Sequence, residues 1–259
     1  MTATTETAAP AAAPQRRAWW RGNLDLLVNP AVVVVGLGLV ALYASTVDFD
    51  SVARRALNPA GLRRQTIEHL VLTGVSTLIV IVIAVPLGVA LSRDAVGRSR
   101  GAVLAVGGFL QALPPLGVVV LIGFWLGFEP SSMILALVLA SLLPVLTNTV
   151  VGLRQVDDAM IEAARGMGMT AWRTLLGVEL PLAIPVMMAG IRVALVLNVG
   201  TATFGAFIGA GGLGVPLFSM LKLFRLDAVL VIASLVAALA LLVDWFGAIV
   251  ERLVAGRAS

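Results

Sequence analysis

Long stretches without charge constrain the fold of this chain more than any other feature of its sequence. Residues 69–92 and 133–152 contain no Asp, Glu, Lys or Arg, and residues 228–250 contain only Asp244. Apolar runs of about 18 residues or more are long enough to cross a bilayer. Because hydrocarbon offers no partner for backbone N–H and C=O groups, such runs cross as helices. We therefore expect an all-α integral membrane protein.

About six spans are expected along the chain. The predicted spans are residues 30–47, 69–92, 101–128, 133–152, 182–208 and 228–250. The third is interrupted at Pro114-Pro115, because proline removes a helical hydrogen bond and its ring clashes with the preceding turn. The composition agrees, since 12% of the residues are charged against about 25% in soluble proteins.

These spans divide the chain into four parts. The parts are an N-terminal tail at 1–29, an extra span with a basic loop at 30–68, a membrane domain at 69–250 and a tail at 251–259. A cleaved signal peptide is the alternative interpretation of the first span, because Tyr43-Ala44-Ser45 places small residues near a candidate cleavage point. An uncleaved anchor is the interpretation we favour.

The charge distribution argues against nucleic-acid binding. The net charge of +4 comes almost entirely from arginine, and Lys222 is the only lysine. The basic residues are scattered between spans, as the positive-inside rule predicts, and form no long run. Arg54, Arg55, Arg63 and Arg64 are the exception, because their loop is expected outside. They would meet anionic headgroups, which we favour, or acidic residues of an external partner.

One interior stretch, residues 157–181, has a water-facing composition. It carries Asp157, Asp158, Glu162, Arg165, Arg173 and Glu179. Residues that start or stop helices divide it into two short helices. The first is capped by Asp157 or Asp158 and ends at Gly166 or Gly168. The second is capped by Thr170 and ends at Pro181. Periodicity places Ile161, Ala164 and Met167 on one face of the first helix, with Glu162 and Arg165 turned away.

The same stretch contains a spaced motif. Glu162-Ala163-Ala164 is followed at fixed spacing by Gly168, Val178 and Leu180-Pro181. This pattern resembles the EAA loop of ABC importer membrane subunits, which implies a cytoplasmic coupling helix that docks on a separate ATPase. The resemblance assigns the ATPase coupling to Glu162, Ala163, Ala164, Gly168, Leu180 and Pro181. An ordinary interfacial helical hairpin is the alternative.

Several chemistries are excluded by missing residues. A Walker A motif ends in Gly-Lys-Ser/Thr, and the only lysine follows Leu221. We therefore expect a transport subunit that is not an enzyme and holds no cofactor, with ATP bound by a partner subunit. With no cysteine and a single histidine, a zinc site of the usual His/Cys type is excluded. His69 is expected to be a polar residue at a span edge.

The resemblance extends from about Glu68 to Leu217. It covers Glu68-His69-Leu70, Val85-Pro86-Leu87-Gly88, Gly166-Met167-Gly168-Met169, Glu179-Leu180-Pro181-Leu182, Met188-Ala189-Gly190-Ile191-Arg192 and Gly209-Ala210-Gly211-Gly212-Leu213-Gly214. These motifs resemble the osmoprotectant branch of ABC importer permeases, which takes glycine betaine, choline and carnitine. Two features depart from that branch: the added N-terminal span, and Pro114-Pro115 where a single proline is expected.

This resemblance implies partners and a location. The partners are a cytoplasmic ABC ATPase, a second permease copy or related chain, an extracytoplasmic solute-binding protein and the lipid bilayer. The location is the bacterial cytoplasmic membrane, with both termini and the 157–181 hairpin in the cytoplasm. The alternatives are an ABC permease for an amino acid or another small solute, and an ATP-independent channel or secondary transporter.

Polar side chains inside the spans are candidates for a solute pathway, because they are costly there without a function or a partner. We predict that Gln111, Asn148, Asn198 and Thr201 line the pathway. Hydrogen bonding between helices is the alternative for each amide. Of the charged residues in the spans, Arg192 is expected to snorkel or face protein, and Asp244 to pair with an arginine.

Overall fold

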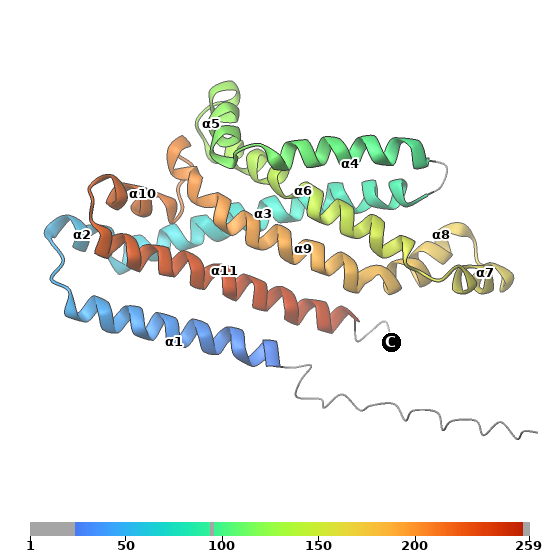
Figure 1. Cartoon of the computed structure of the whole chain (residues 1–259), viewed down its shortest axis with the longest axis horizontal. Helices are drawn as coiled ribbons and strands as arrows, with labels where there is room; N and C mark the ends of the chain where they lie inside the picture. The colour runs from blue at the N-terminus through green and yellow to red at the C-terminus, as the bar shows by residue number, and fades with distance from the viewer. Residues whose placement is uncertain (1–23, 94–95, 256–259) are drawn as a thin grey trace, which may run out of the picture.

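The computed structural model describes residues 24–93 and 96–255, and its elements in this part of the chain are all helical (Figure 1). The elements are α1 (Leu24–Thr46), α2 (Ser51–Ala56), α3 (Pro59–Ser92), α4 (Gly97–Ala112), α5 (Pro115–Leu126), α6 (Pro130–Arg154), α7 (Asp158–Gly166), α8 (Ala171–Thr174), a π-helical turn (Leu175–Glu179), α9 (Leu180–Ala202), a 3₁₀ turn (Thr203–Ile208), α10 (Gly214–Lys222) and α11 (Leu226–Ala255). Most of the expected N-terminal tail, 1–29, and part of the expected C-terminal tail, 251–259, lie outside the described residues.

The spans match the expected set. Five helices in the described part of the chain are long and apolar enough to cross a membrane, and α4 with α5, bent by 94°, makes a sixth when this pair is counted as one broken span. The bend falls at Pro114-Pro115, where the sequence predicts an interruption. The helices extend past the predicted boundaries: α1 begins at Leu24 and α11 continues to Ala255.

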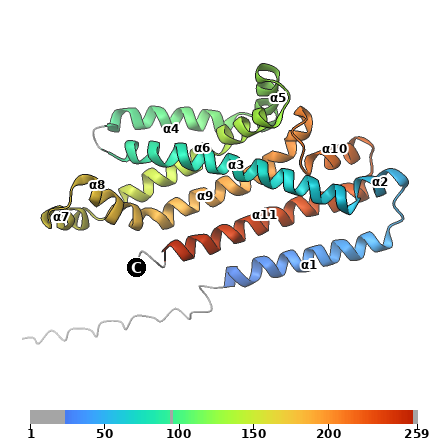
Figure 2. The ribbon, with the colours of Figure 1, turned by 180° about the vertical axis from the view of Figure 1, so that it is seen from behind.

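The helices run roughly side by side along the long axis of the molecule. α3, α6 and α9 pack on one another, α4 lies against α6, and α11 covers α9 and carries α1 on its far side (Figures 1 and 2). The hairpin of α7 and α8 lies at one end, and α2 and α10 lie at the other. The start of α1 and the end of α11 point toward the hairpin end, which agrees with an even number of crossings.

Small residues allow the central helices to pack closely. A Cβ on Gly190 of α9 would lie 2.6 Å from the Pro144 carbonyl oxygen of α6, and one on Gly88 of α3 would lie 2.6 Å from the Thr149 side chain. In a bilayer, close van der Waals packing of this kind replaces the hydrophobic effect as the force between helices. Apolar side chains such as Val80 and Leu146 fill the space around these contacts.

The extra N-terminal helix is attached through polar contacts to α11. The Asn29 amide donates to the Asp244 carboxylate at 3.3 Å, and the Trp245 indole N–H donates to the Leu26 carbonyl at 2.9 Å. At the opposite end of α1, the Tyr43 hydroxyl donates to Asp227. Apolar side chains also meet here, since Val33 of α1 is buried and lies with Leu37 opposite Ala238 and Leu241 of α11, although most side chains of α1 are exposed.

The glycine-rich connection after α9 is fastened to α3. The Glu68 carboxylate accepts the Gly212 N–H at 3.0 Å, and Gly211 and Gly212 have φ of +82° and +80°, a conformation that favours glycine. His69 is fully buried beneath this loop, and its Nε2 lies 2.9 Å from the Val199 carbonyl oxygen. The prediction that His69 is an interfacial polar residue at the edge of a span was therefore wrong, because the loop and α9 cover this side chain.

Candidate functional site

The 157–181 stretch forms the predicted pair of short helices. The Asp157 carboxylate accepts the Ala159 N–H at 2.9 Å and caps α7, and the Thr170 hydroxyl accepts the Arg173 N–H at 3.4 Å and caps α8. Between them, Gly168 has φ of +84°, where a residue with a Cβ is strained. The hairpin therefore follows from local capping and turn signals in the sequence.

The predicted stop at Pro181 was wrong. The backbone passes from α8 through the π-helical turn directly into α9, and Pro181 lies in the first turn of that helix. Proline is tolerated there because the π-helical turn just before it changes the hydrogen-bond register of the continuous helix. The polar hairpin is thus continuous with a membrane-spanning helix, and α8, the turn and α9 form one connected unit.

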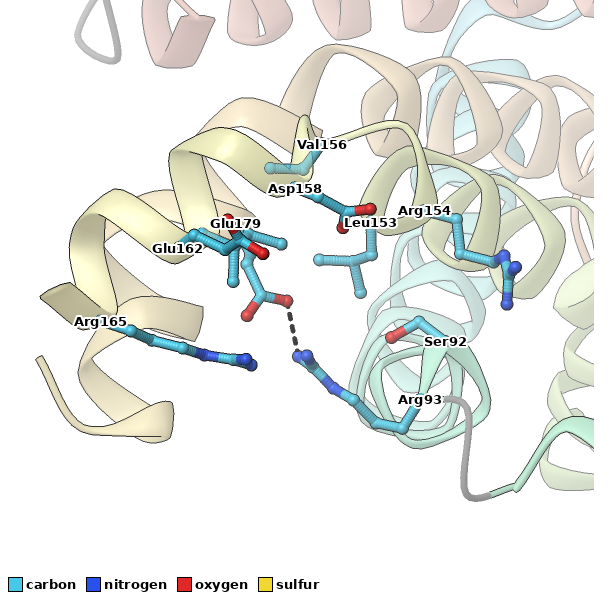
Figure 3. A pocket seen from close by; sticks show the side chains of 10 residues that line it. Ser92, Arg93, Leu153, Arg154, Val156, Asp158, Glu162, Arg165 and Glu179 are labelled. Carbon is cyan, nitrogen blue, oxygen red and sulfur yellow. Dashed lines mark ion pairs between the residues drawn. The ribbon is translucent and has the colours of Figure 1, made fainter.

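A cavity of about 490 Å³ opens between the hairpin and the ends of α3 and α6 (Figure 3). Arg93, which follows α3, pairs with Glu179 of the π-helical turn at 2.8 Å across one side of it. The Glu179 side chain is only 4% exposed. A buried carboxylate is costly without a cation, so this ion pair fixes the base of the hairpin against α3.

The faces of α7 differ from the predicted pattern. Ala164 is buried as expected, but Met167 is 78% exposed because the helix has already ended at Gly166. Glu162 and Arg165 line the cavity with Ile161 instead of facing away from it. Ala163 and Gly168 are exposed, so the small residues of the motif lie on both sides of the helix.

Large apolar side chains are exposed on the same hairpin. They are Met160 at 51%, Met167 at 78%, Trp172 at 66% and Leu176 at 48%. The hairpin lies at the end of the molecule beside the ends of the long helices, where its charged residues are compatible with water and not with hydrocarbon (Figure 1). Large apolar side chains exposed among charged ones on a polar element are typical of a protein-docking surface.

The four predicted pathway residues separate into two pairs. Gln111 and Thr201 line one cavity at the break between α4 and α5. Asn198 is fully buried and donates to the Thr77 hydroxyl of α3 at 3.0 Å, which is the alternative role of hydrogen bonding between helices. Asn148 donates to the Pro144 carbonyl within α6 at 2.8 Å. The structure thus brings two of the four together.

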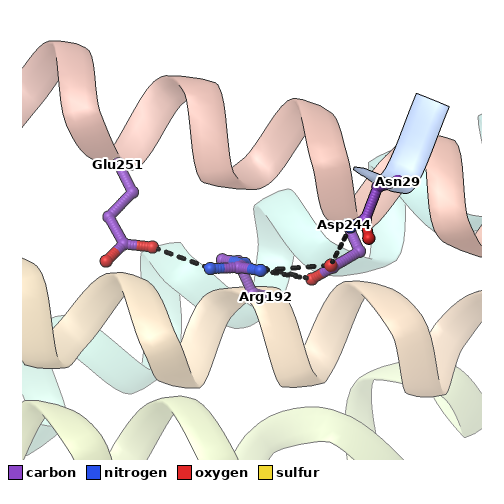
Figure 4. Close-up of polar contacts among 4 residues, drawn as sticks. All are labelled: Asn29, Arg192, Asp244 and Glu251. Atoms are coloured by element: carbon purple, nitrogen blue, oxygen red, sulfur yellow. Dashed lines mark hydrogen bonds and ion pairs between the residues drawn. The ribbon is translucent and has the colours of Figure 1, made fainter. Parts of the chain in front are cut away.

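A charged cluster joins three spans (Figure 4). The Arg192 guanidinium of α9 binds both oxygens of Asp244 at 3.0 and 3.1 Å, and Glu251 two turns further along α11 at 3.1 Å. Asn29 of α1 donates to the same Asp244 carboxylate. The expected pairing of Asp244 with an arginine is confirmed. The role of Glu251 was missed, because it lies just beyond the predicted end of the last span.

A comparison with known families decides the class of this chain. Residues 81–256 match the family described as binding-protein-dependent transport system inner membrane component. The chain belongs to this family. The assignment confirms the prediction of a membrane-spanning transport component that is not an enzyme.

Curated relatives cover most of the chain. The glycine betaine/carnitine/choline transport system permease protein OpuCB of Bacillus subtilis is 39% identical over 75% of this chain and 89% of its own length. The carnitine transport permease protein OpuCB of Listeria monocytogenes is 40% identical, covering 73% and 85%. The osmoprotectant import permease protein OsmY of Salmonella typhimurium is 37% identical, covering 87% and 92%.

The fold also matches a solved transporter. An inward-facing crystal form of the MetNI methionine ABC transporter contains a chain that superposes with a TM-score of 0.68 at 25% identity, covering 75% of this chain and 96% of that chain. A second crystal form gives a TM-score of 0.66. The predicted fold class, an all-α permease of the ABC importer type, is confirmed.

Proposed function

We propose that this chain is the permease subunit of an ATP-driven importer for osmoprotectants with a quaternary ammonium group. The observation that carries the proposal is its identity of 37–39% to relatives named for glycine betaine, carnitine, choline or osmoprotectant import, over most of both chains. The geometry of the 157–181 hairpin supports it, because an exposed apolar and charged surface is continuous with a spanning helix.

In this proposal, the hairpin docks on a separate ATPase that binds ATP. Ala163 is exposed on α7 and Gly168 is exposed just after it, so both would contact the partner directly. Glu162 faces the cavity between the hairpin and the ends of α3 and α6, and would meet a partner group that enters this cavity. Ala164 is buried and would act by letting α7 lie close to its own chain. Leu180 and Pro181 lie at the start of α9 and would transmit the movement into the membrane.

The remaining partners follow from the same class of transporter. A second permease copy or a related chain would complete the passage, and a solute-binding protein would deliver solute at the end formed by α2 and α10. The chain would lie in the bacterial cytoplasmic membrane. The hairpin and both ends of the chain would be in the cytoplasm, and Arg54, Arg55, Arg63 and Arg64 would be outside.

The test is transport by the reconstituted complex. The permease, its ATPase and its binding protein are placed in proteoliposomes, and uptake of labelled glycine betaine, choline, carnitine and methionine is measured with and without ATP. We expect ATP-dependent uptake of at least one of the three quaternary ammonium solutes. Uptake of methionine alone would favour the amino-acid alternative, and uptake without ATP would contradict the proposal.

A further inference from the structure

The cavity at the break in the third span lies away from the hairpin. It has a volume of about 170 Å³ and lies between the end of α4, the start of α5 and the facing sides of α6 and α9. Most of its lining is aliphatic, with Gln111 and Thr201 as the polar side chains. Among the described residues, neither of these two side chains has a hydrogen-bond partner.

Two helix ends meet at this cavity, the carbonyl end of α4 and the N–H end of α5. The Leu113 N–H reaches the Leu110 carbonyl at 3.3 Å, but the next two residues, Pro114 and Pro115, have no N–H to offer the last turn. Helical carbonyls point toward the C-terminus, where the aligned peptide dipoles place a partial negative charge. The cavity lies where the chain turns by 94° away from that end.

The lining selects for one kind of ligand. No Asp, Glu, Lys or Arg lines the cavity, so apart from its polar side chains its partial charges come from the two helix ends, negative at α4 and positive at α5. A small, strongly hydrated cation would lose its water against aliphatic walls. A cation whose charge is spread over methyl groups contacts such walls and still gains from the carbonyl dipoles. Ends of broken helices bind cations by this means in other transporters.

The size agrees with this choice. A volume of about 170 Å³ corresponds to roughly six waters at their liquid share of about 30 Å³ each. A quaternary ammonium group, a nitrogen surrounded by four carbons, falls within that limit. No aromatic ring lines the cavity, so the tight cage that holds such cations elsewhere is absent from it. A site that solute must leave has to bind weakly.

We propose that this cavity binds the quaternary ammonium group of the solute during its passage, with the carbonyl end of α4 as the electrostatic partner. The proposal rests on the proposed function, because it presumes a solute of that class. Gln111 and Thr201 are free to meet the polar end of the solute. Since α6 leads into the hairpin and α9 leaves it, movement of the hairpin shifts two walls of the cavity.

The experiment measures binding without the binding protein, which has its own selectivity. The permease with its ATPase is placed in nanodiscs, and tetramethylammonium is observed by saturation-transfer NMR of its methyl signal. Ala140→Leu fills the cavity from α6, and Gln111→Lys adds a positive charge at its rim. Gln111→Glu adds a negative charge at the same place. Ala233→Leu, on an exposed face of α11, is the matched control for Ala140→Leu.

We expect both Ala140→Leu and Gln111→Lys to weaken binding about tenfold or more, and Gln111→Glu to strengthen it, as a charge within a few Å requires. Ala233→Leu should bind as the unaltered protein does. Choline should compete, whereas its uncharged isostere 3,3-dimethyl-1-butanol should not. Equal competition by the isostere, absence of binding, or equal binding by all variants would overturn the site. ATP-driven uptake by the unaltered complex would still support the proposed function.

Discussion

The Arg93–Glu179 ion pair offers the sharpest test of how the hairpin is held. At 2.8 Å the Coulomb attraction is about 6 kcal/mol with an effective dielectric constant of about 20. Desolvation of Glu179, which is 4% exposed, opposes this gain, and the Arg93 side chain at 38% exposure is partly screened. Loss of Arg93 leaves a buried carboxylate unpaired, and we expect a net cost of about 1–3 kcal/mol.

The variants are Arg93→Ala, Glu179→Gln and the double substitution. Arg93→Ala should loosen the hairpin from α3, so that more ATP is hydrolysed per solute transported. The double variant should recover part of this loss, because the neutral amide is less costly to bury than an unpaired carboxylate. The assay is the ratio of ATP hydrolysis to uptake in proteoliposomes, with Arg63→Ala near the start of α3, away from the hairpin, as the control.

Two results would refute this reasoning. An unchanged ratio of ATP hydrolysis to uptake in Arg93→Ala would show that the ion pair does not hold the hairpin. A double variant whose loss equals the sum of the two single losses would show that the two side chains do not interact.

Three further predictions concern the hairpin and its attachment. Gly168→Trp should abolish uptake while the protein still reaches the membrane, because Gly168 is exposed on the proposed docking surface and its φ of +84° is strained for a residue with a Cβ. Retained uptake would show that this residue is not part of the docking surface. Gly190→Val should cost about 1–3 kcal/mol and lower the thermal unfolding temperature, whereas Gly200→Val on the same helix, with open space around its Cβ position, should have little effect. Asn29→Ala should leave uptake intact and expose α1 to protease, since its hydrogen bond to Asp244 helps attach that helix; unaltered protease resistance would contradict that role.

Local signals in the sequence were sufficient for the spans and the hairpin. Uninterrupted apolar runs predicted the spans, and Pro114-Pro115 predicted the break, because a missing N–H acts on its own helix. The Asp157 and Thr170 caps followed from the same kind of local rule. The coupling role of Glu162 and its neighbours stays a prediction that the structure leaves open to experiment.

Features set by tertiary contacts could not be predicted in this way. Pro181 has the local signature of a stop, but the π-helical turn before it carries the chain into α9. His69 follows a polar stretch, yet the glycine-rich loop folds back over it. The direction in which Asn198 points depends on α3 packing against α9, and the apolar sequence around it carries no signal for that face.

The central claim is that a hairpin on the cytoplasmic side is held by a separate ATPase. The chain has no cysteine, so Ala163→Cys places a single thiol on the exposed side of α7. A membrane-impermeant maleimide should leave this thiol unlabelled in intact cells, label it in inverted vesicles stripped of the ATPase, and fail to label it once the ATPase is added back. Labelling from outside intact cells, or labelling that the ATPase does not alter, would contradict the account.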